Sequence, residues 1–183
     1  MTDVVVQRLQ KNTCCSYCGA AFEPDSAWPR TCLFCENITY LNPLPVSVML
    51  VPVEEDGLLL VRRAIEPCRG QVALPGGFMG LGETWQEAGV RELREETGIV
   101  IPAHKVTLFG ALTSPNGHLL VFGRTPPISA ADVPGEFPAD ETEELVIARE
   151  PVPLAFPLHN QAALRFWSLK GRSTPGDAIS LGG

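Results

Sequence analysis

The sequence predicts an α/β fold, in which strands and helix alternate around one core, preceded by a small cysteine-containing module. Apolar stretches with strand periodicity alternate with a helical stretch between Val46 and Lys170. Four of the six cysteines form two C-x-x-C pairs before this region. A chain of 183 residues, 45% of them hydrophobic, is long enough for one core-bearing domain plus a small appendage.

Composition and charge narrow the function classes. No apolar run approaches the roughly 20 residues that span a bilayer, so we expect a soluble protein without a membrane partner. The first residues lack the apolar core of a secretory signal, which predicts a cytoplasmic location. The formal net charge of -7 argues against nucleic acid as a partner, because backbone phosphates are bound by many Lys and Arg side chains. A phosphate-containing substrate would therefore need help from a metal ion.

Residues 1–42 form the predicted module. Each C-x-x-C pair can supply two thiolates to one tetrahedral ion, which in a reducing compartment predicts a structural Zn²⁺ in a zinc ribbon. Reduced structural thiols or a disulfide pair are the alternative. Cys14 competes with Cys15 in register but lacks the spacing, and Cys68 is isolated. The predicted zinc ligands are Cys15, Cys18, Cys32 and Cys35.

Prolines in "TYLNPLP" mark the boundary to a second domain, residues 43–170. The stretches 46–53 and 58–64 flank "EEDG", which predicts a hairpin of buried strands. "QVALPGG" predicts a short strand that ends in a glycine turn. A helix is expected from Thr84 to Thr97, with Gly98 as its stop.

The second half of this domain continues the pattern. The stretches 106–113 and 118–124 flank "SPNG" as a second hairpin, a proline-rich loop follows over 125–140, and "EELVIA" predicts a strand. Asn160 is expected to cap a last helix that Gly171 ends. The tail, residues 171–183, has too little apolar content to pack and is expected to be flexible.

Three glutamates share one face of the predicted first helix. At about 100° per residue, Glu92, Glu95 and Glu96 fall within an arc of about 100°. Like charges at this spacing repel one another, and a bound cation would relieve the repulsion. Carboxylate oxygens suit Mg²⁺ or Mn²⁺, which can bridge protein and phosphate. The charge pattern alone also fits a solvated, salt-bridged helix.

The spacing around this helix is more specific than its charge. Gly77 is followed by five residues, Glu83, seven residues, and then "RELREETGI" from Arg91 to Ile99. Every fixed position of the Nudix box, G-x5-E-x7-R-E-U-x-E-E-x-G-U with U apolar, is matched. The chain therefore resembles the Nudix hydrolase family over roughly residues 45–170.

This resemblance implies a Nudix fold, a mixed β-sheet between helices, and metal-dependent cleavage of nucleoside diphosphates linked to another group. It implies that Glu95 and Glu96 are the principal ligands of Mg²⁺ or Mn²⁺, and that Glu92 is a further ligand or the general base. The Gly77 carbonyl would join the metal shell, Glu83 would assist, and Arg91 would orient the acids. No single glutamate is assigned as the base.

The subgroup is indicated by features outside the box. A four-cysteine ribbon followed by "YLNPLPV", and a late "LAFP", resemble the NADH, FAD and ADP-ribose pyrophosphatases. The S-Q-P-W-P-F-P-x-S signature of NADH pyrophosphatases is missing, and Val72 stands where relatives often have Trp. ADP-ribose-like or FAD-like substrates are therefore favoured over NADH. The competing hypothesis is a non-catalytic, nucleotide-sensing protein whose ribbon is an interaction module. Assembly as a homodimer is left open.

Individual side chains outside the box carry weaker signals. Arg62 and Arg63 could bind a phosphate or be solvated strand-end charges. Phe78 could stack on a base, although packing beneath the glycine turn is the favoured interpretation. His118 and His159 have no evident carboxylate partner and are expected to be ordinary structural or exposed histidines.

Overall fold

The structure is a computed structural model that describes residues 11–137 and 140–169. The chain divides into two compact units, Met1–Pro43 and Leu44–Gly183. No helix in the described ranges has the length and hydrophobicity of a membrane span. The expected flexible tail, residues 171–183, lies outside the described residues.

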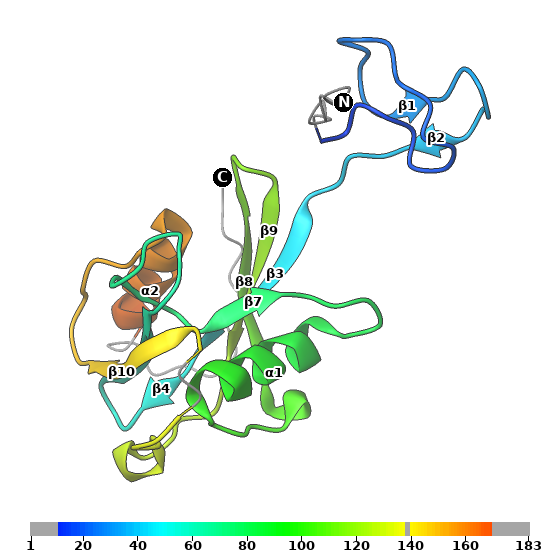
Figure 1. The fold of residues 1–183 in the computed structure, drawn as a ribbon. Helices are drawn as coiled ribbons and strands as arrows, with labels where there is room; N and C mark the ends of the chain where they lie inside the picture. Colours follow the sequence, from blue (N-terminus) through cyan, green and yellow to red (C-terminus); the bar gives the residue numbers. More distant parts are fainter. Residues whose placement is uncertain (1–10, 138–139, 170–183) are drawn as a thin grey trace, which may run out of the picture. The chain divides into compact units, whose positions relative to one another are not determined.

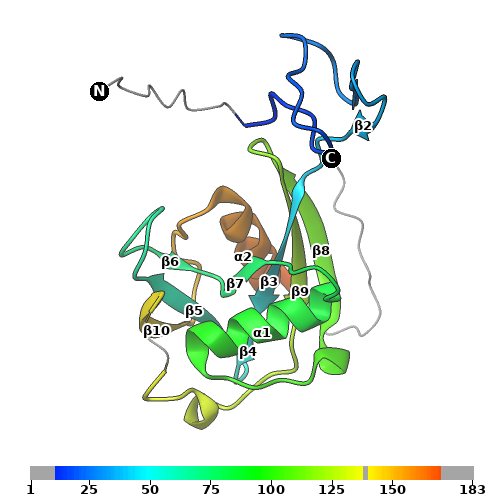
Figure 2. The same ribbon diagram turned by 45° about the vertical axis from the view of Figure 1, so that its right-hand side comes forward.

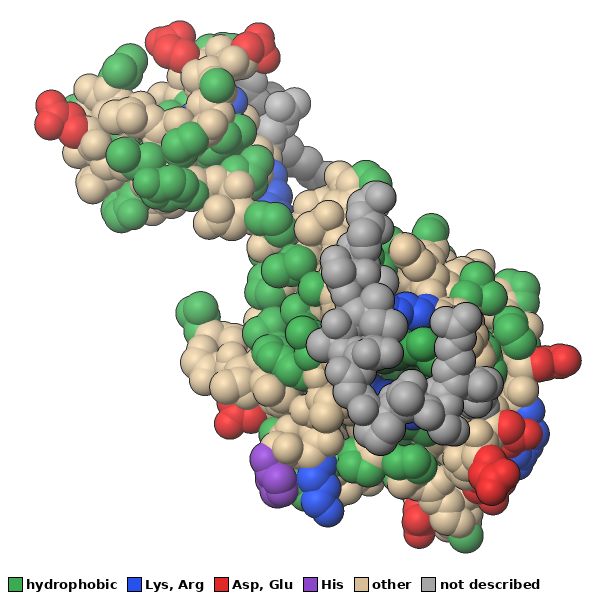
Figure 3. Space-filling model, turned by 180° about the vertical axis from the view of Figure 1, so that it is seen from behind, with side chains coloured by type: hydrophobic (Ala, Val, Ile, Leu, Met, Phe, Trp, Pro, Cys, Tyr) green, Lys and Arg blue, Asp and Glu red, His purple; other side chains and the backbone are tan. Residues whose placement is uncertain are grey.

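The N-terminal unit has almost no apolar core. Its strands, β1 (Arg30–Thr31) and β2 (Ile38–Thr39), form one short antiparallel pair. Cys15 and Cys32 are its only buried hydrophobic residues in the described part of the chain. Hydrophobic side chains instead lie on its surface (Figure 3), including Tyr17, Leu33, Phe34 and Tyr40. Burial of apolar surface therefore contributes little to holding this unit together.

The larger unit is built on a four-stranded mixed sheet, shown in Figure 1. Its central strand, β3, is parallel to β9, while β7 and β8 pair antiparallel on either side. In the order of the sheet the strands are β7 (Gly76–Phe78), β3 (Leu44–Leu50), β9 (His118–Arg124) and β8 (Thr107–Ser114).

A second sheet lies around β5. Antiparallel pairing joins β5 to β10, β4 and β6. These strands are β4 (Pro52–Val53), β5 (Gly57–Arg63), β6 (Val72–Ala73) and β10 (Thr142–Ala148). The strand predicted from "EELVIA" is therefore confirmed as part of β10.

Two helices cover opposite faces of β3, as Figure 2 shows. Val48 and Leu50 pack in a cluster with α2 (Pro157–Leu169). Met49 and Val51 pack in another cluster with Leu93 of α1 (Trp85–Thr97). Because Val48, Met49 and Leu50 are all buried, the second half of β3 is a continuous apolar run rather than an alternating one. The predicted mixed sheet between helices is confirmed.

Helix α1 begins and ends where its capping residues stand. Thr84 and Glu87 form a capping box, and Gly98 adopts a left-handed conformation with φ 76°. The hydroxyl of Ser47 donates to the carbonyl of Trp85 at 2.7 Å, which ties the first turn to β3. A Cβ at Gly89 would collide with Met49, so glycine lets helix and sheet approach closely.

The first predicted hairpin is wrong in part. Residues 44–50 belong to the β7-β3-β9-β8 sheet, and only Pro52–Val53 pairs with β5. Pro52 has no N–H to continue the β3 ladder, and the chain changes sheets there. The predicted glycine turn is also wrong, because Gly76 and Gly77 pair with β3 as part of β7. The second hairpin, β8 with β9, is confirmed.

The last helix starts earlier than expected. It begins at Pro157, a residue suited to the first helical turn. Asn160 is not its cap: its Oδ1 accepts from the N–H of Leu154 at 2.8 Å, and its Nδ2 donates to the Leu154 carbonyl at 2.9 Å. The described helix ends at Leu169, and the predicted stop, Gly171, lies outside the described residues. The long loop over 125–140 contains a short 3-10 helix, Ala130–Asp132.

Candidate active site

The glutamates of α1 face strand β7 at its glycines. Glu96 is only 8% exposed, and its Oε2 accepts from the N–H of Gly76 at 2.9 Å. A Cβ at Gly77 would collide with the carboxyl group of Glu92, so glycine is required for this approach. Glu92 is half-buried and Glu95 is exposed. The structure thus brings Gly77 and the predicted carboxylates to one end of the sheet.

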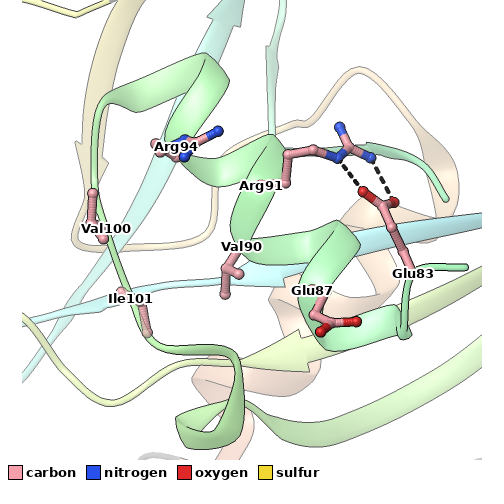
Figure 4. Close-up of a pocket in the computed structure, with 7 residues that line it drawn as sticks. All are labelled: Glu83, Glu87, Val90, Arg91, Arg94, Val100 and Ile101. Carbon is pink, nitrogen blue, oxygen red and sulfur yellow. Dashed lines mark hydrogen bonds and ion pairs between the residues drawn. The ribbon is translucent and has the colours of Figure 1, made fainter. Parts of the chain in front are cut away.

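Arg91 connects the acids. Its Nε and Nη2 donate to both oxygens of Glu83, at 2.6 and 3.0 Å, a geometry visible in Figure 4. Its Nη1 donates to Glu92 at 2.7 Å and to Glu95 at 3.1 Å, and its Nη2 also reaches the carbonyl of Phe78 at 3.1 Å. These hydrogen bonds occupy the guanidinium fully. Arg91 is therefore placed to orient carboxylates rather than to bind a substrate.

Glu83 and Arg91 lock each other in their charged forms. The hydrogen bonds from Arg91, with one from the N–H of Gly80, lower the pKa of Glu83 to about 2. The hydrogen bonds that Arg91 donates, first those to Glu83 and then the one to Glu92, raise the pKa of Arg91. This pair remains ionised throughout the physiological pH range.

Glu96 carries the opposite kind of perturbation. Burial raises the pKa of Glu96 to about 8, and the negative charges of Glu92 and Glu141 add to the effect, while the Gly76 hydrogen bond opposes it. Burial also raises the pKa of Glu92, against the influence of Arg91. A cation beside these groups would stabilise their charged forms. The electrostatics therefore fit a divalent metal ion.

The acid cluster borders a cavity of about 550 Å³. Glu92, Glu95 and Glu96 line it from α1. Asp140 and Glu141, which precede β10, line it from the other side. The sequence interpretation missed these two, because only the pairing of β10 with β5 brings them to α1. A separate hollow of about 390 Å³ lies beside Glu83, Glu87 and Arg94, with Val90, Val100 and Ile101 in its lining (Figure 4).

The carboxylates form an open site rather than a closed cage. Within the described ranges, the four ribbon cysteines are the only group of three or more His, Cys, Asp or Glu side chains arranged to hold a metal ion, with ligand atoms within 4.8 Å of one another. Arg91 holds Glu92 and Glu95 through one nitrogen, Nη1, and the N–H of Gly76 holds Glu96. Mg²⁺ keeps several waters and is commonly shared between one or two carboxylates and substrate phosphates. The donor set fits such an ion.

The cysteine cluster has the dimensions of a tetrahedral metal site. The Sγ atoms of Cys15 and Cys35 are 3.7 Å apart, and those of Cys18 and Cys32 are 3.6 Å apart. A tetrahedron with Zn–S bonds of about 2.3 Å has edges of about 3.8 Å. All six cysteines are free thiols in the structure, so the disulfide alternative is not realised.

Backbone and side-chain donors surround these sulfurs. The N–H of Tyr17 donates to the Sγ of Cys15 at 3.4 Å and lowers the pKa of that thiol to about 6. The Asn37 side chain does the same at Cys35 and lowers its pKa. Such donors favour the thiolate form that a metal requires. Cys14 stands outside the cluster, with its Sγ 3.8 Å from the hydroxyl of Thr13.

The two candidate arginines have different surroundings. Arg62 forms an ion pair with Glu144 at 2.7 Å and donates to the carbonyl of Gly70 at 3.0 Å. Arg63 donates through Nε to the carbonyl of Pro67 at 2.8 Å, and its guanidinium lies 5.2 Å from the centroid of the Phe156 ring.

Phe78 does not pack beneath the glycines, so that interpretation is wrong. Its side chain is 57% exposed, because it follows Gly77 on a short edge strand. Its ring lies 5.7 Å from that of His118, whose Nδ1 and backbone N–H contact the hydroxyl of Ser114. An exposed Phe78 in contact with a partly buried His118 therefore stands next to the glycines of the site.

His159 is a structural histidine, as expected. It is 6% exposed, and its Nδ1 accepts from the N–H of Leu74 at 3.3 Å. Burial, reinforced by the charge of Arg63, lowers the pKa of His159 to about 3. The ring is therefore neutral at physiological pH and packs against Phe122 and Phe156.

Comparison with known proteins identifies the family. The NUDIX domain matches residues 43–166, and the chain belongs to this family. A NUDIX hydrolase structure from Nitrosomonas europaea is similar over 90% of this chain and 95% of its own, with 26% identity and a TM-score of 0.68. A bifunctional NMN adenylyltransferase/ADP ribose pyrophosphatase from Francisella tularensis, 22% identical with a TM-score of 0.57, shares the fold over 72% of this chain and 43% of its own.

Two curated relatives match part of the domain. The ADP-ribose pyrophosphatase of Methanocaldococcus jannaschii is 44% identical over 85 residues, which is 44% of this chain and 48% of that protein. The NAD-capped RNA hydrolase NudC of Salmonella typhi is 32% identical over 88 residues, 48% of this chain and 34% of that protein. The chain spans half or less of the length of these relatives.

Proposed function

We propose that this protein is a Mg²⁺-dependent or Mn²⁺-dependent pyrophosphohydrolase that cleaves a nucleoside diphosphate linked to another moiety. The observation that carries the proposal is the acid cluster itself. Every acid of the box is present, and the cluster opens to a cavity large enough for part of a nucleotide. Glu96 is a buried carboxylate whose pKa is raised in a cleft, a pattern common at functional sites.

The protein residues have separate tasks in this proposal. Glu95 and Glu96 hold the metal, with Glu92 and the Gly77 carbonyl beside them, and Arg91 with Glu83 keeps the carboxylates in place. The bound metal would neutralise the pyrophosphate and lower the pKa of an attacking water. A carboxylate of the cluster accepts the proton of that water. Glu141 borders the same cavity and is the added candidate for metal or water contact.

The substrate is proposed to be ADP-ribose-like or FAD-like rather than NADH. The 44% identity to an ADP-ribose pyrophosphatase supports this choice, and so does the missing NADH-type signature. Phe78, 57% exposed next to Gly77, offers a face for stacking a nucleobase. The four cysteines are proposed to hold a structural Zn²⁺ with no open coordination position.

A substrate panel tests the proposal. Purified protein would be incubated with ADP-ribose, FAD, NADH, NAD-capped RNA, dinucleoside polyphosphates and nucleoside triphosphates, with Mg²⁺ or with a chelator, and products separated by chromatography. We expect Mg²⁺-dependent release of a nucleoside monophosphate, fastest from ADP-ribose or FAD. Nucleotide affinity without turnover of any panel member would instead support the nucleotide-sensing alternative.

A further inference from the structure

Two adjacent arginines at the end of β5 are used in opposite ways. Successive side chains of a strand point to opposite faces, so Arg62 and Arg63 meet different neighbours. The guanidinium of Arg62 is paired with Glu144 and bonded to the carbonyl of Gly70. Arg62 therefore ties the segment after β5 to strand β10, and its charge is already balanced.

Arg63 is held in place but not neutralised. Its Nε is fixed by the Pro67 carbonyl, and its guanidinium lies over the Phe156 ring. Phe156 is supported in turn by buried His159, 5.0 Å away between ring centroids. Within residues 11–137 and 140–169, Arg63 makes no ion pair, and its two terminal nitrogens have no hydrogen-bond acceptor. A rigid guanidinium with free donors is the result.

This guanidinium borders the acid cluster. Thr142 lies directly across from Arg63 in the β5–β10 ladder, and Glu141 immediately precedes Thr142. The N–H of Ala64 donates to the carbonyl of Glu141 at 2.8 Å, which fixes the two chain segments together. The positive charge of Arg63 acts on Glu96, though after larger effects of burial and hydrogen bonding. Arg63 thus stands at the edge where Glu96 and Glu141 meet.

A phosphate suits the chemistry of this position. A planar guanidinium matches phosphate oxygens with two parallel hydrogen bonds, and stacking on an aromatic ring leaves those donors free. A buried hydroxyl adds to the polar character of the edge, because Thr142 Oγ1 has no hydrogen-bond partner among the described residues. A diphosphate that reaches the carboxylates through a metal carries further oxygens in need of donors.

We propose that Arg63, and not Arg62, binds a phosphate of the diphosphate substrate. This inference rests on the proposed function, because it takes the acid cluster as the metal site. Arg62 serves to tie β5 to β10. The identity of the group beyond the diphosphate is not part of the assignment.

The test compares matched variants in binding as well as turnover. The affinity of the non-hydrolysable α,β-methylene analogue of ADP-ribose would be measured by calorimetry with Mg²⁺ for wild type, Arg63→Gln, Arg63→Lys and Arg62→Gln. We expect Arg63→Gln to weaken binding by about 10- to 100-fold, because charge-assisted hydrogen bonds are lost. Arg63→Lys should recover part of the affinity as a point charge, and Arg62→Gln should change it by much less. Arg149→Gln, which removes ion pairs to Glu54 and Asp56, controls for net charge.

Several outcomes would overturn the inference. One is an Arg63→Gln variant, folded by circular dichroism, that binds the analogue like wild type. Another is a larger loss for Arg62→Gln. A third is Arg63→Gln weakening Mg²⁺ binding without nucleotide as much as it weakens the analogue, which would mean that Arg63 acts through Glu96. Failure of the proposed function would give a different result, because the wild type would then turn over no substrate. If the wild type also failed to bind the analogue, both the proposed function and the role of Arg63 would be refuted.

Discussion

The two units of this chain bring metal-ligating side chains together in different ways. In the ribbon, four sulfurs lie within 4.8 Å of one another, and only Cys15 and Cys32 are buried among its described hydrophobic residues. In the larger unit, β3 and β5 contain residues that are 0% exposed, and the carboxylates beside them are held by hydrogen bonds from Gly76 and Arg91. A metal ion in the ribbon would hold this unit together in place of a hydrophobic core. In the larger unit the hydrophobic core already exists, and a metal ion would take part in the reaction.

The two candidate metal sites also differ in whether a substrate can reach the metal-ligating side chains. A site with four thiolates has no free position for a substrate, which is typical of structural zinc. The acid cluster opens to a cavity of about 550 Å³ and leaves room for water and phosphate. The ribbon would thus hold a metal ion that stabilises it, the acid cluster would hold one that takes part in the reaction, and each part can be tested alone.

The largest effect is expected at the acid cluster. Glu96→Gln, and separately Glu95→Gln, should leave the fold intact but lower kcat by about 100-fold or more, because each removes a charged ligand from the metal site. Glu150→Gln, an exposed acid outside the cluster, is the control. Steady-state kinetics with Mg²⁺ would measure the loss. Near wild-type turnover in either variant would remove these residues from the catalytic assignment.

The next effect is expected in the ribbon. Cys15→Ser combined with Cys18→Ser should release zinc and loosen residues 11–42, because folding of such a small unit is coupled to its metal. Elemental analysis and hydrogen exchange of the same preparation would show both changes. Cys14→Ser is the matched control, since Cys14 lies outside the cluster and should keep the zinc. A wild-type protein without zinc would contradict the metal assignment.

A smaller effect is expected at Phe78, next to Gly77 on β7. Phe78→Ala should raise KM by about tenfold with little change in kcat, as expected for loss of one stacked base. Phe78→Tyr should preserve the stacking face. Leu81→Ala, at another exposed apolar side chain of the same loop region, should change neither parameter. If Phe78→Ala and Leu81→Ala behaved alike, Phe78 would not be a base-stacking residue.

The effect expected to be smallest on turnover is a pH dependence of stability in the larger unit. His159 has a pKa of about 3 when folded and about 6.5 when unfolded, so the unfolded chain binds one more proton between these values. The contribution of His159 to stability is therefore fully present above about pH 6.5 and is lost as pH drops toward 3, by up to about 1.4 kcal/mol per pH unit. Urea unfolding at pH 7, 6 and 5 should show a steeper fall for wild type than for His159→Leu. Equal slopes would contradict a buried neutral histidine.

Local signals in the sequence were sufficient for the parts of the fold that chemistry dictates. Helix α1 was predicted with both ends, because Thr84 and Gly98 are caps that act within one turn. The spacing of the box placed Gly77 and the carboxylates correctly in one cluster. The cysteine pairs were found because a tetrahedral ion imposes the C-x-x-C spacing.

The pairing of strands that are distant in the chain could not be predicted from such local signals. The run from Val46 to Val53 is apolar except for Ser47, so nothing in its periodicity showed that it splits between two sheets at Pro52. Glu141 enters the site only because β10 pairs with β5. Phe78 is exposed on β7, which is an edge strand of its sheet among the described residues, and the position of a strand in a sheet is a tertiary property. Asn160 resembles a cap in sequence, but it bonds back to Leu154.

The most direct test of the difference between the two units is Mg²⁺-dependent turnover and zinc content measured on the same preparations. The variants are Glu96→Gln and the combined Cys15→Ser with Cys18→Ser. We expect Glu96→Gln to retain zinc and lose turnover, and the soluble cysteine variant to lose zinc and retain turnover, with at most a higher KM. A well-folded, zinc-free cysteine variant with abolished turnover would contradict the account, because the ribbon would then belong to the active site.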